Sequence, residues 1–297
     1  MIPPRPMKPA SQNLTPDDLQ SLQYPLIATT KIDGIGCRLY DGHAWTPQNK
    51  PIPNLLVQAW AEQMSHLQGL QGELFAGNFN NTTSIVMSQT KSVKGLEFHV
   101  YDNFEDRRAY AARLNNARVT LQGKGNQKSV IPMTLVAYHT CCDATAVANE
   151  YKRIIKTKGE GLVLRDPTGE YKFGRTTLNE GLALKMKPFA DAEATIRGIL
   201  PLQTNTNPKV ENALGLSSRG KSQANLQPLQ MLGAFIVEDG QGRVFKIGGG
   251  DMTKAQREAW WRIRASLIGK TLTYAYLNHG GKNLPRSPKF KGFRLDI

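Results

Sequence analysis

Residues 160–194 read EGLVLRDPTGEYKFGRTTLNEGLALKMKPFADAEA, and the prediction of the fold starts from them. This segment opens with a short apolar run between charged residues, where Gly161 permits a ligand to approach the backbone closely. A second apolar run, Leu184–Lys187, carries two lysines. Alternate residues of a strand share a face, so Lys185 and Lys187 should point the same way. Two such ammonium groups favour an anion such as phosphate. An exposed strand face is the alternative.

Three motifs upstream of this segment carry further candidate residues. Lys31-Ile32-Asp33-Gly34 places a lysine at a strand end, where nearby positive charge could lower its pKa and make it a nucleophile. Taken alone, that motif indicates a surface turn. Glu73 ends an apolar strand and could bind a ribose hydroxyl or a divalent metal, or it could simply be solvated. Tyr101 could stack on a purine base, although core packing explains such an aromatic residue more often.

Basic residues follow in two further motifs. Tyr171–Arg175 (YKFGR) comes directly after the first apolar run, and Arg286 and Arg294 belong to the C-terminal sequence RSPKFKGFRLD. A basic tail is usually only solvated, so these arginines are weak evidence when each is taken alone.

In their order and spacing the six motifs resemble those of the covalent nucleotidyltransferases, and most of all the minimal ATP-dependent DNA ligases of phages and large algal viruses. The shared pattern is KxDG, GE, an aromatic–Asp pair, EGxVLR, KxK and RxPxFxxxRxD, and it extends from about Leu26 to Ile297. The resemblance implies an α+β fold. Residues 1–188 would form the adenylation, or nucleotidyltransferase, domain (ATP-grasp-like, with antiparallel sheets and helices). Residues 189–297 would form an OB-fold β-barrel.

The resemblance also implies the reaction, in which nicks in duplex DNA with 3′-hydroxyl and 5′-phosphate ends are sealed. Lys31 would attack the α-phosphorus of ATP, the AMP would pass to the 5′-phosphate, and the 3′-hydroxyl would then displace it. ATP and Mg²⁺ would be required, with Mn²⁺ able to substitute. Such enzymes act in DNA replication, repair and recombination.

Individual roles follow from the matched motif positions. The implied catalytic residues are Lys31, Asp33, Glu160, Lys185 and Lys187. The implied ATP and AMP contacts are Lys31, Glu73 at the ribose, Tyr101 at the adenine, Glu160, Lys185, Lys187, and Arg286 and Arg294 at the pyrophosphate. The implied metal ligands are Asp33, Glu73 and Glu160. The expected DNA contacts are Arg38, Arg175 at the 5′-phosphate, Lys209, Arg219 and Lys221.

Two positions depart from the family pattern. Gly36 stands where the first motif usually has an arginine, and Pro47 takes the place of a second arginine. Arg38 lies two residues beyond Gly36 and should share its strand face. We therefore expect Arg38 to lean back over Gly36 and partly replace the first missing arginine, with a solvated surface arginine as the alternative.

The segment Gln203–Pro228 has no core-forming pattern and reads as a long exposed loop or hairpin. It occupies the place of the latch with which the viral enzymes close around DNA. Lys209, Arg219 and Lys221 make it mildly basic, as a DNA clamp requires. A linker without defined structure is the alternative.

Periodicity predicts the remaining elements. Strands are expected within Leu26–Tyr40 and at Gly69–Phe75, Glu97–Tyr101, Gly161–Arg165, Leu182–Lys187, Ala194–Leu200, Met231–Val237, Arg243–Gly248 and Thr271–Leu277, and helices at Thr15–Leu22, 52–68, 105–118, 143–158 and Lys254–Ser266.

Composition agrees with a nucleic-acid partner, because the net charge is +14 and cations set against phosphates release counterions. Three cysteines without a CxxC pair indicate reduced thiols rather than a zinc site. No signal peptide or membrane-spanning run is apparent, so we expect the chain in the cytoplasm, which would be the host's if a phage encodes it. We also expect a monomer. RNA-containing ends, an RNA ligase and a capping-type nucleotidyltransferase remain as alternatives, together with an OB-fold binding protein without catalysis.

Overall fold

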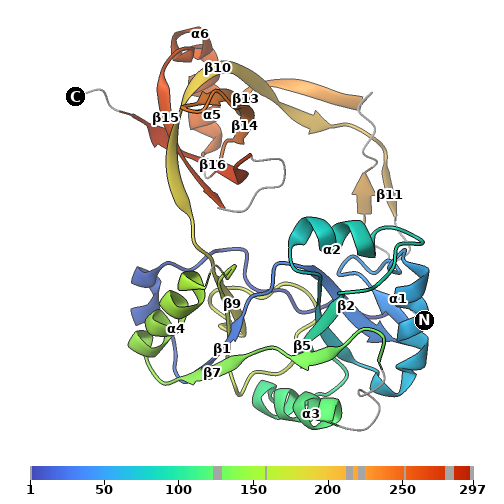
Figure 1. The fold of residues 1–297 in the computed structure, drawn as a ribbon. Coiled ribbons are helices and arrows are strands. Elements are labelled where there is room, and N and C mark those ends of the chain that lie inside the picture. Colours follow the sequence, from blue (N-terminus) through green and yellow to red (C-terminus); the bar gives the residue numbers. More distant parts are fainter. Residues whose placement is uncertain are drawn as a thin grey trace. The chain divides into compact units, whose positions relative to one another are not determined.

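The computed structural model describes residues 2–122, 129–157, 159–211, 217–219, 225–250, 252–277 and 284–294. The chain divides into two compact units, Met1–Pro188 and Phe189–Ile297 (Figure 1). Both units mix helices and strands, so the predicted α+β class is confirmed. No helix among the described residues is long and apolar enough to cross a membrane.

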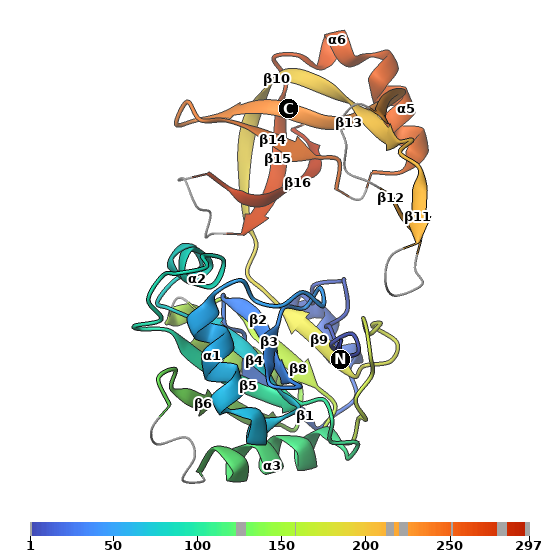
Figure 2. The same ribbon diagram turned by 90° about the vertical axis from the view of Figure 1, so that its right-hand side faces the viewer.

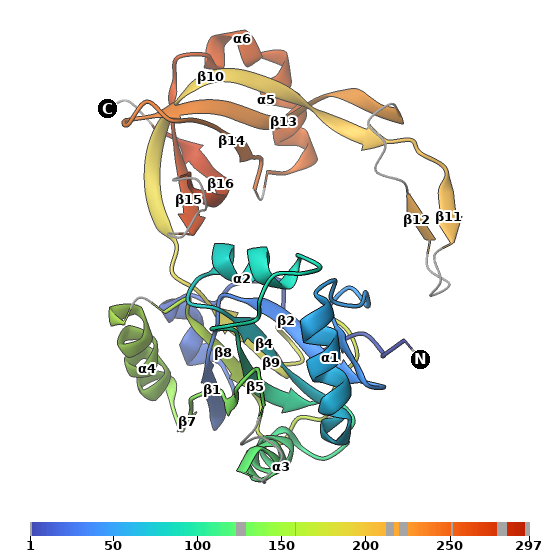
Figure 3. The same cartoon turned by 45° about the vertical axis from the view of Figure 1, so that its right-hand side comes forward.

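The first unit is built on two sheets with helices on their outer sides (Figure 3). One has the strand order β7-β1-β8-β9 and the other β3-β2-β4-β5-β6. The strands are β1 Leu26–Thr30, β2 Ile35–Tyr40, β3 His43–Trp45, β4 Leu70–Phe75, β5 Glu97–Asn103, β6 Met133–Leu135, β7 Tyr138–Cys141, β8 Leu162–Arg165 and β9 Ala183–Met186. The helices are η1 Pro16–Ser21, α1 Leu55–Gln63, η2 Ser65–Leu67, α2 Phe79–Val86, α3 Tyr110–Gln122 and α4 Ala144–Lys156.

The second unit contains five strands that close into a barrel in the order β10-β13-β14-β16-β15, with α5 packed on β13 (Figure 2). Its elements are β10 Ala190–Asn205, β11 Lys209–Glu211, β12 Ser217–Arg219, β13 Leu226–Asp239, β14 Val244–Gly248, α5 Lys254–Arg262, α6 Arg264–Leu267, β15 Thr271–Leu277 and β16 Arg286–Phe293. Most pairs in the two units are antiparallel, as expected, but β5–β6 and β14–β16 are parallel.

Local chemistry explains where the elements begin and turn. Asn54 caps α1 by accepting hydrogen bonds from the backbone of Leu56 and Val57, so this helix starts later than the expected residue 52. The turn between β1 and β2 requires a glycine at residue 34. A β-carbon there would lie 2.1 Å from the carbonyl oxygen of Leu74. The sequence pattern missed α2, β3, β6 and β7 in the first unit and the barrel strand β16 in the second.

The predicted loop or hairpin at 203–228 is largely a hairpin. Strands β10 and β13 stay paired out to Asn205 and Leu226, and β11 pairs with β12 beyond them. Residues 212–216 and 220–224 of this segment lie outside the described residues.

A buried ionic triad joins the two sheets of the first unit. Asp102 at the end of β5 accepts from Arg113 Nε at 2.7 Å and from Arg165 Nη1 at 2.6 Å, and its side chain is 0% exposed. Arg113 also donates to the carbonyl oxygen of Gly169 at 3.0 Å. The triad therefore ties β5, α3 and β8 together behind the space between the sheets.

Replacing Asp102 by alanine should destabilise the protein by about 3–5 kcal/mol, because two guanidinium groups would stay buried without their carboxylate. The measurement is urea unfolding of the full chain. Glu180→Ala is the matched control, because it breaks the more exposed pair with Lys172 and should destabilise the protein much less. Equal losses in the two variants would contradict the role given to the triad.

Candidate active site

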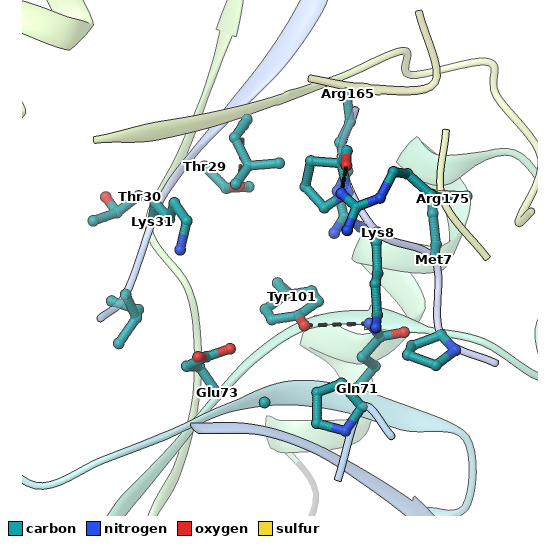
Figure 4. Close-up of a pocket in the computed structure, with 16 residues that line it drawn as sticks. Met7, Lys8, Thr29, Thr30, Lys31, Gln71, Glu73, Tyr101, Arg165 and Arg175 are labelled. Carbon is teal, nitrogen blue, oxygen red and sulfur yellow. Dashed lines mark hydrogen bonds between the residues drawn. The ribbon is translucent and has the colours of Figure 1, made fainter. Parts of the chain in front are cut away.

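A pocket of about 290 Å³ lies between the two sheets of the first unit (Figure 4). This volume is near the lower end of the range usual for small-ligand sites, ~300–1,000 Å³. Strands β1, β2, β4, β5 and β8 supply its walls, together with the N-terminal arm, by which we mean residues 2–15 ahead of η1. The lining residues are Pro6, Met7, Lys8, Pro9, Thr29, Thr30, Lys31, Ile32, Gly36, Pro47, Gln71, Glu73, Tyr101, Val163, Arg165 and Arg175.

Lys31 lies at the end of β1 and forms an ion pair with Glu160. Its Nζ is 2.7 Å from Glu160 Oε2, and the two side chains are 23% and 9% exposed. Glu160 Oε1 in turn accepts from the ammonium group of Lys187. The backbone N–H of Lys31 donates to the carbonyl oxygen of Gly161 at 2.9 Å, which fixes the lysine beside the carboxylate. One carboxylate thus holds two of the predicted catalytic lysines.

Close packing at Gly161 makes this arrangement possible. Gly161 has φ +138°, and a β-carbon there would lie 2.1 Å from the carbonyl oxygen of Met186. Only glycine permits the backbone before β8 to approach the end of β9 so closely. Glu160 and Lys187, the residues next to these two, are therefore brought within reach of one another.

Glu73 lies on β4 across the pocket from Lys31 (Figure 4). The pKa of Glu73 is raised to about 7, mainly by burial. The Lys31 ammonium and a hydrogen bond from the backbone of Gly34 lower this pKa, whereas the carboxylates of Glu160 and Asp33 raise it. The structure therefore brings the predicted residues Lys31, Asp33, Glu73 and Glu160 into one electrostatic group.

Tyr101 stands in the pocket between Lys31 on one side and Lys8 and Arg175 on the other (Figure 4). Its hydroxyl accepts a hydrogen bond from Gln71 Nε2 at 3.2 Å. The Arg165 guanidinium lies 5.1 Å from its ring centroid. Burial raises the pKa of the Tyr101 phenol, so the phenol is neutral. A neutral, fixed aromatic ring in a pocket of this size suits stacking against a flat base.

Lys185 and Lys187, which strand alternation predicts to point the same way, contact different groups in this structure. Lys187 reaches Glu160, whereas Lys185 Nζ donates to the carbonyl oxygens of Ala10 and Ser11, the latter at 2.6 Å. The reason is that β9 ends at Met186 while the N-terminal arm runs beside it. The sequence pattern could not show which neighbour each lysine meets.

The N-terminal arm is the part of the pocket that sequence reasoning missed. Lys8 forms a parallel bridge with Arg175, and its backbone donates to the carbonyl oxygen of Gly174 at 2.7 Å. Arg175, a predicted DNA contact, donates to the carbonyl oxygen of Pro9 at 2.8 Å. Burial and the like charges of Arg175, Arg5 and Arg38 lower the pKa of Lys8. Positive charge thus gathers at the end of the pocket opposite Lys31.

Arg38 does not lean back over Gly36, so the prediction of its position was wrong. Arg38 is only 2% exposed. Its guanidinium donates hydrogen bonds to the carbonyl oxygens of Pro4 and Thr46 and to Asn49 Oδ1. The space over Gly36 is filled as well, because a β-carbon at residue 36 would lie 2.7 Å from Pro47 Cγ. The two departures from the family pattern therefore touch each other.

The predicted residues of the second unit form their own contacts. Arg294 Nη1 lies 2.8 Å from Glu193 Oε2, and Arg286 begins β16, paired with Leu277 of β15. Lys209 pairs with Arg219 across β11 and β12. Lys221 lies outside the described residues.

No three histidine, cysteine or carboxylate side chains gather into a preformed metal site within the described part of the chain. The carboxylates of Asp33 and Glu160 nevertheless lie close enough to Glu73 to raise its pKa. This donor set fits a Mg²⁺ ion that is held by one or two carboxylates together with substrate phosphates and water, which is the usual form of Mg²⁺ binding. Both Glu160 oxygens already accept from lysines, so binding by Glu160 would require a rearrangement.

Comparisons with known proteins agree with this geometry. A family model described as the DNA ligase OB-like domain matches residues 227–294. The solved structure of the Chlorella virus DNA ligase-adenylate is 28% identical, with a TM-score of 0.55, and the match covers 99% of each chain. No curated protein matches the chain at a significant level.

Two more distant structures share the fold. A Lig E DNA ligase is 23% identical with a TM-score of 0.69, and the match covers 98% of this chain and 99% of that one. The ATP-dependent DNA ligase of bacteriophage T7, in complex with ATP, is 18% identical with a TM-score of 0.53, and the match covers 99% of both chains.

The raised pKa of Glu73 predicts a pH dependence of stability. Between its ordinary value of 4.5 and about 7 the native protein binds more protons than the unfolded chain, so stability falls as pH rises through this window. Glu73→Gln cannot ionise and should escape this loss. Its stability relative to the parent protein should increase by on the order of 2 kcal/mol from pH 5 to pH 8, allowing for screening by solvent in the pocket.

Urea unfolding at both pH values measures this difference. Glu62→Gln, on the exposed side of α1, is the matched control and should show a constant difference. A Glu73→Gln difference that does not change with pH would show that the native carboxyl titrates like the unfolded one.

Proposed function

We propose that this chain is a minimal ATP-dependent DNA ligase of the viral type, which seals nicks in duplex DNA through a lysyl–AMP intermediate on Lys31. The observation that carries the proposal is Lys31 Nζ, held 2.7 Å from Glu160 at a pocket that also contains Glu73 and Tyr101. A fixed primary amine beside a base-sized pocket and a ribose-binding carboxylate suits transfer of an adenylyl group.

Three phosphoryl transfers make up the reaction. Lys31 Nζ attacks the α-phosphorus of ATP, so that a P–N bond forms, pyrophosphate leaves and the amine gives up a proton. An oxygen of the nick's 5′-phosphate then attacks the same phosphorus and the P–N bond breaks, which returns the amine. Finally the 3′-hydroxyl attacks the 5′-phosphorus and AMP departs. Positioning and charge stabilisation dominate such transfers.

The pocket residues divide these tasks. Glu160 holds the Lys31 ammonium in place. When Lys31 loses a proton to become the nucleophilic amine, this ion pair would break. Glu73 would accept hydrogen bonds from the ribose hydroxyls, and Tyr101 would stack on adenine. Lys187 and Lys185 would neutralise the α-phosphate, which for Lys185 requires leaving the carbonyl oxygens of the arm. Arg286 and Arg294 would orient pyrophosphate in the first step only.

Magnesium bound with the nucleotide supplies additional neutralisation of phosphate charge, and Mn²⁺ should substitute for it. Asp33, Glu73 and Glu160 are the residues that would hold the ion. Lys8 and Arg175 would receive the 5′-phosphate end of the nick, since two cations facing one pocket favour an anion. We propose a monomer that acts on DNA in the cytoplasm, with RNA-containing ends as a substrate class to be tested.

Lys31→Ala should abolish covalent labelling of the protein by α-labelled ATP, because the other lysine that lines the pocket, Lys8, lies at its opposite end. Denaturing gel electrophoresis after incubation with labelled ATP, and separately with labelled GTP, measures this. Lys156→Ala, an exposed lysine on α4, is the matched control and should label normally. Undiminished label in Lys31→Ala would place the nucleophile elsewhere, and label from GTP alone would indicate a capping-type enzyme.

The hairpin at 203–228 should serve as a DNA clamp. Because Asn205 and Leu226 remain paired, residues 206–225 can be replaced by Asn-Gly, a two-residue turn suited to a hairpin. Self-adenylylation should stay near normal while affinity for nicked DNA falls. The slope of log affinity against log salt should decrease by up to about three, because three cations are removed.

A variant with Lys209, Arg219 and Lys221 changed to glutamine separates the two contributions of this segment. It keeps the hairpin and loses its charge, so it should reproduce the change in salt slope. Unchanged affinity for nicked DNA in the shortened protein would reduce the segment to a linker.

A further inference from the structure

The backbone at Lys187 is held by a side chain from the N-terminal arm. Asn13 Oδ1 accepts from the backbone N–H of Lys187 at 2.9 Å, and Asn13 Nδ2 donates to the carbonyl oxygen of the same residue at 3.0 Å. This pair of bonds imitates what a neighbouring strand would offer. It occurs one residue beyond the end of β9 at Met186, just before Pro188, which has no N–H to donate.

The backbone of the arm is itself held in place on both sides of Asn13. The backbone N–H of Ala10 donates to the carbonyl oxygen of Ala183 at 2.9 Å, and that of Leu14 donates to the carbonyl oxygen of Lys185 at 2.9 Å. Ala10 and Leu14 are each only 2% exposed and pack in the core of the first sheet. Asn13 therefore projects from an anchored backbone and can restrain Lys187 firmly.

A continuous series of contacts connects Asn13 to the nucleophile. Asn13 holds the main chain of Lys187, the Lys187 ammonium binds Glu160 Oε1, and Glu160 Oε2 lies 2.7 Å from Lys31 Nζ. Gly161 packs against the main chain at Met186 on the β8 side of β9. A β-carbon at residue 161 would lie 2.1 Å from the carbonyl oxygen of Met186. The position of Lys187 is thus set from both sides of the strand end.

From these contacts we propose that Asn13 is a positioning residue for adenylyl transfer, acting through Lys187. Its side-chain amide fixes the end of β9, so that the Lys187 ammonium faces Glu160 and the incoming α-phosphate. A displaced lysine stabilises the developing charge less well, since catalytic groups must be held closely to their productive geometry. The inference rests on the proposed function.

Asn13→Ala should slow formation of the lysyl adenylate about tenfold, which corresponds to ~1.4 kcal/mol of transition-state stabilisation. Single-turnover labelling with α-labelled ATP measures the rate constant separately from the labelled fraction. The rate at saturating ATP should fall, with little change in the ATP concentration that gives half the maximal rate, because the lost interaction belongs to the transition state. Gln12→Ala, at the exposed neighbouring residue, is the matched control and should react normally.

A double-mutant cycle tests whether the effect passes through Lys187. In a Lys187→Ala background the change of Asn13 to alanine should slow the reaction no further. A second tenfold loss in that background, or a loss of labelled fraction at an unchanged rate, would assign Asn13 to general stability and overturn the proposal.

Asn13→Asp provides a second variant should the alanine variant not fold. It preserves the side-chain volume and an acceptor for the Lys187 N–H, and loses the bond donated to the Lys187 carbonyl. Its rate of lysyl-adenylate formation should lie between those of the parent protein and Asn13→Ala. If Asn13→Ala does not fold, the rate of Asn13→Asp should still lie below that of the parent protein. The parent rate in Asn13→Asp would overturn the inference, whereas absence of label in the parent protein would refute the proposed function instead.

Discussion

The carboxylate of Glu160 lies between two ammonium groups, and the site depends on this ion triad. Lys31 and Lys187 reach its two oxygens from the ends of different strands, and its side chain is 9% exposed. Glu160 and Asp33 also raise the pKa of Glu73, while the Lys31 ammonium lowers it. Glu160 therefore links Lys31 to Lys187 and to the other carboxylates of the site, so a change at any one of these groups alters the electrostatics of the rest. Glycine at residue 161 and the end of β9 are the structural conditions for this arrangement.

Sequence alone predicts the fold class and many of the strands, because motifs at turns and strand ends consist of residues that are close together in the chain. The order of KxDG, GE, EGxVLR and KxK predicted the α+β class and the C-terminal OB domain, and β1, β2, β4, β5, β8 and β9 occur close to the expected residues. Short elements such as α2 and β6 were missed because too few residues repeat to establish a period. Helix α1 starts later than predicted because the cap at Asn54 sets its first residue.

The errors at the site share one physical origin, which is that a pattern gives the direction of a side chain but not its surroundings. Arg38 does occupy the alternate strand position, but the arm covers it and supplies a backbone acceptor at Pro4. Lys185 likewise meets the carbonyl oxygen of Ser11 instead of the pocket. The arm contacts the rest of the first unit largely through its backbone. Because it is rich in proline and has no periodic pattern of apolar residues, these contacts could not be predicted from the sequence. Lys8 was missed for the same reason.

Gly36 and Pro47 have a consequence for the way such a sequence can change over time. The proline ring occupies the volume that any side chain at residue 36 would need, with 2.7 Å between Pro47 Cγ and a hypothetical β-carbon. Arginine at residue 36 alone would meet this ring, whereas arginine at residue 47 alone would leave Gly36 without its cover. The two positions are therefore coupled in one direction: a side chain at residue 36 fits only once the proline at residue 47 has moved or been replaced.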